Sequence, residues 1–192
     1  MLARRIKNGP EKDRLLSILL EDSDLPDGHW TTGLELAYRT DLHTRRTDEV
    51  RRAQESGSVT VARTLKSDRN DLSVALRVTP FASAVDAAAY LPTFIDYLYL
   101  LVSKAHTTED HREVEEVPGL PDAWLDEVQL VRRPFDGPKV VRKARIVVGV
   151  IDWRILVIQC DSSPAGELLP WPDVAAIAGL QAAKVRRYQS ET

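Results

Sequence analysis

The chain has 192 residues, of which 43 % are apolar and 29 % are charged, and this composition excludes a disordered chain. Its net charge of −3 excludes the globally basic field that would hold nucleic acid. A single cysteine, Cys160, excludes an internal disulfide framework and a cysteine-based zinc site. The length suits one domain over residues 1–192, with residues 1–9 as candidates for a disordered end.

The first half of the chain predicts one short helix followed by several strands. Residues 10–22 suit a helix, because Pro10 fits a first turn, acidic residues follow it, and leucines then form an apolar stripe. The later part of residues 29–41 predicts a strand. Two further strands are predicted at residues 58–65 and 71–79, where apolar side chains alternate with polar ones.

Two segments leave alternatives open. Residues 43–58 are dense in charge and suit either a solvated helix or a long loop. Residues 83–104 are helical in composition, with Ser83 as the N-cap and Asp86 in the favourable first turn. Pro92 removes a backbone donor inside this segment and predicts either a kink or two helices.

The last part of the chain predicts three strands and a closing helix. Residues 123–132 suit a strand, and the helix begins at Pro172 or Asp173 and runs to about residue 188. Between them lies the densest apolar run, residues 142–162. Its arms, residues 144–150 and 153–160, predict two antiparallel strands that flank Asp152.

Both faces of the second arm are apolar, so we expect protein to cover both sides of it. The turn at Ile151-Asp152 is not a favoured hairpin pair, and Gly149 is an alternative position for a bulge. Strands follow one another in hairpin-like runs and do not alternate strictly with helices. This order predicts an α+β fold, in which a single antiparallel sheet of about six strands carries packed helices.

Several short stretches also resemble a known group of proteins. They are Leu20–Trp30 (LEDSDLPDGHW), Phe81–Tyr90 (FASAVDAAAY), Val117–Asp122 (VPGLPD), the Arg145–Ile158 hairpin and the closing amphipathic helix. Together they resemble actinobacterial lipoproteins and the extracellular sensor domains of actinobacterial Ser/Thr kinases, which share the PsbP-like fold. The resemblance implies a curved antiparallel sheet with helices on its faces and a non-enzymatic protein that binds a partner or a small ligand. This chain lacks the paired cysteines of those sensor domains, and the resemblance supplies no catalytic residues.

The sequence offers no recognised catalytic or metal site. We find no nucleophile elbow, phosphate loop, dinucleotide fingerprint or zinc-protease helix. His106 and His111 share a polar loop with Glu109, Asp110 and Glu113, but their spacing matches no standard metal site, and a solvated loop is the favoured interpretation. We therefore expect no enzyme activity, no metal and no cofactor, and keep an enzyme with an unrecognised site as the third hypothesis.

The leading hypothesis is a binding or adaptor domain that docks a protein partner. A basic cluster surrounds the start of the predicted hairpin and comprises Arg132, Arg133, Lys139, Arg142, Lys143 and Arg145. It suits an acidic partner, although charge that protects an edge strand explains it equally simply. The helix face that carries Tyr97, Tyr99 and Leu100 is the other candidate docking surface, since it lies off the main apolar stripe.

The alternative hypothesis is a carrier or sensor of a small apolar ligand, held in a cavity between the sheet and the helices. Trp30 and Trp171 would suggest such a ligand if they lined one cleft. The apolar run at residues 15–20 is too short for a signal peptide, no lipid-attachment motif follows it, and no stretch approaches a membrane span. We therefore expect a cytoplasmic protein.

Overall fold

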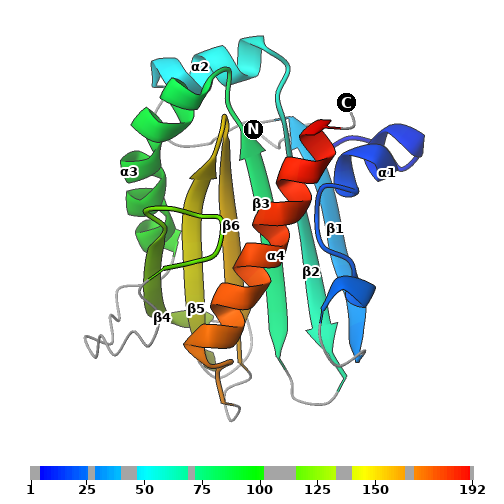
Figure 1. The fold of residues 1–192 in the computed structure, drawn as a ribbon, viewed down its shortest axis with the longest axis vertical. Coiled ribbons are helices and arrows are strands. Elements are labelled where there is room, and N and C mark those ends of the chain that lie inside the picture. The colour runs from blue at the N-terminus through cyan, green and yellow to red at the C-terminus, as the bar shows by residue number, and fades with distance from the viewer. Residues whose placement is uncertain are drawn as a thin grey trace.

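A computed structural model describes residues 5–25, 29–39, 47–68, 72–101, 116–132, 140–162 and 167–190. Within these ranges six strands form one antiparallel sheet with the order β1-β2-β3-β6-β5-β4 (Figure 1). The predicted α+β fold is therefore confirmed. The strands are β1 (Trp30–Arg39), β2 (Val59–Ser67), β3 (Ser73–Pro80), β4 (Trp124–Arg132), β5 (Val140–Ile151) and β6 (Arg154–Asp161).

Helices pack on both faces of this sheet. The described helices are α1 (Pro10–Leu16), the 3-10 turn η1 (Asp22–Asp24), α2 (Asp48–Glu55), α3 (Ala84–Leu101) and α4 (Trp171–Ser190). Helix α4 runs across one face, and α1 and α4 approach each other at one end of the sheet (Figure 1). None of these described helices combines the length and the hydropathy that a membrane crossing requires.

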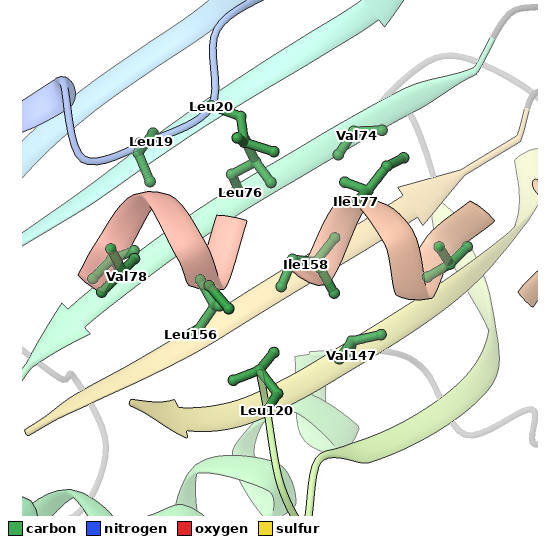
Figure 2. Close-up of a cluster of buried hydrophobic side chains, with 14 of the residues drawn as sticks. Leu19, Leu20, Val74, Leu76, Val78, Leu120, Val147, Leu156, Ile158 and Ile177 are labelled. Atoms are coloured by element: carbon green, nitrogen blue, oxygen red, sulfur yellow. The ribbon is translucent and has the colours of Figure 1, made fainter. Parts of the chain in front are cut away.

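The hairpin of β5 and β6 lies inside the sheet and is buried on both faces, as predicted. Ile155 and Val157 belong to the apolar cluster beneath α3, whereas Leu156 and Ile158 belong to the cluster beneath α4. Figure 2 shows the second cluster, in which side chains of neighbouring strands meet under the helix: Val74, Leu76, Val78, Val147, Leu156 and Ile158. Alternation along the strand thus divides one apolar run between two cores.

The turn of this hairpin differs from the prediction by one residue. Ile151 pairs with Arg154, so the two loop residues are Asp152 and Trp153. Asp152 has a φ of 51°, a left-handed conformation that Asp tolerates better than most residues. Trp153, expected as the first residue of the second strand, instead lies in the turn and is 37 % exposed.

Gly149 does not mark a bulge, because the pairing of β5 with β6 is continuous from Ala144 to Ile151. A glycine is needed here because the side chain of Leu120 occupies the space that a Cβ atom would take. A Cβ atom at this position would lie 2.8 Å from Cδ2 of Leu120, which packs against the strand.

The first predicted helix is shorter than expected. Helix α1 ends at Leu16, although the sequence pattern continues toward residue 22. Tertiary hydrogen bonds capture the following backbone: Gln181 donates to the carbonyl of Ile18 at 2.8 Å and accepts from the N–H of Leu20 at 2.9 Å. These contacts replace the hydrogen bonds that another helical turn would have made.

Helix α3 begins as predicted and then passes through Pro92 as one continuous helix, so the prediction of two helices is wrong. Ser83 caps it, with its Oγ accepting from the N–H of Asp86 at 3.1 Å. Tyr90 and Phe94 lie one turn apart on either side of Pro92 and are both buried, and this packing offsets the missing hydrogen bond.

The charged segment contains a helix, α2, which is fixed to α3 by an ion pair. Arg52 donates to Oδ1 of Asp86 at 2.5 Å, and this hydrogen bond, which outweighs desolvation, holds the pKa of Asp86 below its usual value. The helical alternative is therefore confirmed for residues 48–55, and residues 40–46 lie outside the described part.

The turn predicts a selective effect of substitution at Asp152. Asp152→Val should lower the free energy of unfolding by about 1–2 kcal/mol, because a β-branched residue resists the left-handed conformation. Asp152→Asn removes the same charge but tolerates this φ, so it should lose less stability than Asp152→Val and differ from the wild type only by the attraction of Asp152 to Arg154. Urea denaturation of the two variants measures the difference, and equal losses would show that charge, not backbone conformation, matters here.

The buried thiol predicts a pH dependence at the alkaline end. Burial raises the pKa of Cys160 from 9.0 to about 12. Above pH 9 the unfolded thiol ionises while the folded one stays protonated, so its contribution is complete below pH 9 and declines up to pH 12. The slope should be at most ~1.4 kcal/mol per pH unit. Cys160→Ala removes this component, so the stability difference between the two proteins should shift with pH only above pH 9.

Candidate ligand-binding cavity

A cavity of about 660 Å³ opens at the end of the sheet where α1 approaches the C-terminal end of α4. Five parts of the chain form it: the helix α1 region, the α2–β2 turn, the ends of the central strands with the residues that follow β3, the β5–β6 turn, and the C-terminal part of α4. Its lining comprises Glu11, Arg14, Leu15, Ile18, Ser56, Gly57, Ser58, Val59, Val61, Val78, Pro80, Phe81, Ala82, Trp153, Arg154 and Tyr188.

Antiparallel pairing places these lining residues at one end of the sheet. Strand β2 begins there, β3 ends there and β6 begins there, so Val61 pairs with Val78 and Pro80 pairs with Arg154. Leu156, two residues after Arg154, lies in the cluster beneath α4. Side chains alternate along a strand, and Arg154 therefore points to the same face as α4.

The cavity has an apolar interior and a more polar mouth. Val61, Val78 and Ile18 are buried and form the inner wall. Glu11 and Arg14 of α1 are exposed and lie at the opening. An apolar wall with few polar groups is the usual character of a small-molecule site, and the volume falls within the range of such sites.

Arg154 is the exception in this wall. The residue is only 6 % exposed, and its Nη1 is buried without a hydrogen-bond partner among the described residues. The guanidinium carbon lies 3.7 Å from the centre of the Trp153 ring, in a cation–π contact. Burial lowers the pKa of Arg154, and the charges of Asp152 and Tyr188 compensate only in part. An arginine nevertheless stays protonated in proteins, so a positive charge lies beneath the apolar wall.

Arg63 provides a direct comparison, because it is equally buried but satisfied. Its Nε donates to Glu35 at 2.7 Å, and its Nη1 donates to the carbonyls of Leu19 and Leu20 at 3.2 and 2.8 Å. The chain thus provides one buried arginine with a carboxylate and carbonyls, and leaves the other beside a cavity.

The two tryptophans named from the sequence do not line this cavity. Trp30 is partly buried against the core beneath α4, and Trp171 is buried at the start of that helix. Arg145 lies 5.1 Å above the ring of Trp171 and donates to Glu127 at 3.1 Å and to the carbonyl of Leu169 at 2.5 Å. Arg145 therefore joins β4, β5 and the segment before α4.

The structure describes some of the other predicted binding residues fully, some by their backbone alone, and some not at all. Lys143 is exposed on β5. The structure places the backbones of Arg132, Arg142, Tyr97 and Tyr99 in strands and in α3, but not their side chains; Arg133 and the loop with His106 and His111 lie outside the described residues. Their role in binding stays a prediction. Within the described part of the chain, no three His, Cys, Asp or Glu residues gather as metal ligands would.

Sequence reasoning missed Arg154 as a site residue. The available signal was an arginine placed directly after a tryptophan inside the densest apolar run of the chain. A buried cation in that position needs a hydrogen-bond acceptor, either elsewhere in the chain or in a bound molecule.

No model of a known protein family matches the chain. No curated protein sequence matches it either. Among solved structures, the fold is similar to the extracellular domain of PknH from Mycobacterium tuberculosis, with a TM-score of 0.48 and 11 % identity over 96 % of this chain and 99 % of that one. It is also similar to an uncharacterised protein from Mycobacterium smegmatis, with a TM-score of 0.43 and 8 % identity over 92 % and 98 % of the two chains.

The first of these structures is an extracellular domain, and it contradicts the expectation of a cytoplasmic protein. That expectation depended on the apolar run at residues 15–20 being too short for a signal peptide, and a signal peptide is not part of a folded domain. The single buried Cys160 does not decide the compartment, because one enclosed thiol can form no internal disulfide in an oxidising environment or a reducing one. We withdraw the assignment.

The two buried arginines predict opposite responses to the same substitution. Arg63→Met should lower the free energy of unfolding by about 3 kcal/mol, because Glu35 and two backbone carbonyls lose their donor. Arg154→Met removes an unpaired buried charge and keeps the aliphatic packing, so its stability should stay within about 1 kcal/mol of the wild type or exceed it. Chemical denaturation compares them, and a large loss in both would show that Arg154 is held by contacts as favourable as those of Arg63.

Proposed function

We propose that this chain is a non-catalytic binding or sensor domain that holds a small apolar ligand in the cavity beside α1 and the end of α4. The observation that carries the proposal is the cavity itself, with about 660 Å³ of space lined mainly by aliphatic and aromatic side chains. The space opens to solvent, and a largely apolar wall with a few polar groups is the usual character of a small-molecule site.

Burial of a ligand in this cavity would supply the binding energy. Each CH₂ group removed from water contributes roughly 0.8 kcal/mol, so a ligand with several such groups gains enough to offset its loss of freedom. The half-buried side chains of Leu15, Val59 and Tyr188 form the part of the wall that a ligand would cover.

Other assignments made from the sequence remain proposals beside this one. They are a single domain over residues 1–192, a relationship to the PsbP-like proteins, and the docking of a protein partner on the basic cluster or on the α3 face. The internal hydrogen bonds of Arg145 reduce the number of charges that a partner would meet. The absence of catalysis is likewise part of the proposal.

Nile red, a neutral dye whose emission rises and shifts to the blue in apolar surroundings, tests the cavity. The wild-type protein should bind it saturably. Ala82 is exposed at the mouth, and Ala82→Trp should block entry and weaken binding by roughly tenfold or more.

Ala88→Trp is the matched control, since Ala88 is exposed on α3 and does not line the cavity. It adds the same indole to the surface and should bind the dye as the wild type does. A dye signal that does not saturate, or equal binding by the two tryptophan variants, would contradict the proposal.

A further inference from the structure

We propose that the cavity selects an organic monoanion, a carboxylate with an apolar body, and that Arg154 pairs with its acidic head. This inference rests on the proposed function and names the class of ligand. It depends on the one buried cation in the described wall of the cavity, and on the space next to it.

The guanidinium of Arg154 lacks, within the described part of the chain, a hydrogen-bond acceptor that its buried position requires. Nη1 of Arg154 has no partner among the described residues, while the equally buried Arg63 has a carboxylate and two carbonyls. An isolated buried charge is costly, and a carboxylate accepts two parallel hydrogen bonds from a guanidinium. A bound carboxylate would give Arg154 what Glu35 gives Arg63.

The charges around Arg154 limit the charge of the ligand that the site accepts. One guanidinium neutralises one negative charge. Asp152 already acts on Arg154 through its charge, so a doubly charged group such as a phosphate would meet repulsion there. Glu11 and Arg14 at the mouth are both exposed and opposite in sign, so solvent screens their charges and they largely cancel. These surroundings favour a single negative charge.

The aliphatic wall sets the direction of the ligand's apolar body. Arg154 follows the turn directly, and Val61 and Val78 extend the wall away from it along β2 and β3. A ligand with its head at Arg154 would therefore lay its chain over these valines and beside Ile18. The head is at one end of the cavity wall and the aliphatic surface continues from it.

A ligand carboxylate reaches Arg154 only if the side chains that cover Nη1 move. Nη1 is covered in this structure, and the Trp153 ring stacks on the guanidinium. Trp153 belongs to a two-residue turn and is 37 % exposed, so an outward movement of its ring gives up the cation–π contact and part of its packing, and the new ion pair with the carboxylate must offset that loss. We infer that the ring shifts as the carboxylate binds, and that its fluorescence reports binding.

A matched pair of ligands tests the inference in the unaltered protein. Decanoate and decanol share a chain length and differ in charge at about pH 7.5, where a carboxylic acid is ionised. Displacement of Nile red should show decanoate binding roughly ten- to hundredfold more tightly than decanol, the effect of one hydrogen-bonded charge pair. Equal affinities would overturn the inference and leave the proposed apolar cavity standing. Failure of Nile red itself to bind would overturn the proposed function instead.

Variants locate the effect. Arg154→Met should abolish the preference for decanoate and preserve the binding of decanol and Nile red. Arg14→Gln removes an exposed cation at the mouth and should change the preference by less than about threefold, because exposed charges contribute little. Trp153→Phe should remove the change in tryptophan emission caused by decanoate. A preference that persists in Arg154→Met and disappears in Arg14→Gln would assign the selectivity to the mouth and overturn the role of Arg154.

Discussion

The burial of β6 on both faces is the constraint on which the rest of this structure depends. Ile155 and Val157 pack under α3, while Leu156 and Ile158 pack under α4, so the strand has no polar face to offer to solvent. A slip of one residue would exchange the two sets and disrupt both cores at once. The same alternation fixes Arg154 on the α4 face, at the point where the turn delivers the chain into the strand.

The cavity follows from where the elements on that face end. Helix α1 stops at Leu16 because the backbone after it is held by Gln181 and Arg63. Helix α4 reaches the same end of the sheet with Tyr188. The space between them is bounded by the first residues of β2 and the last of β3. Arg63 is hydrogen-bonded to Glu35, Leu19 and Leu20 and does not line this space.

The contrast between two buried arginines gives the site its chemistry. Both side chains face the same core, and burial disfavours charge in both. Arg63 is neutralised from within the chain, whereas Arg154 has a tryptophan ring on one side and a cavity beside it. Packing alone would not retain an unpaired cation in a wall of valines, because an apolar residue of similar volume is as stable or more so. Binding of an anion is the account that uses both the charge and the space.

The sequence by itself determined the strands, the antiparallel α+β fold, the two-sided burial of the hairpin and the Ser83 cap, because each depends on neighbours a few residues apart. It did not determine which positively charged side chains are hydrogen-bonded to other parts of the chain. Glu35 lies 28 residues from Arg63, and Leu169 lies 24 residues from Arg145, and no local pattern reports such partners. Arg145 was therefore expected to bind a partner and is held internally, while Arg154 was passed over and lines the cavity. Only the tertiary structure, which brings distant segments to one face, decides which buried charged side chain is hydrogen-bonded within the chain.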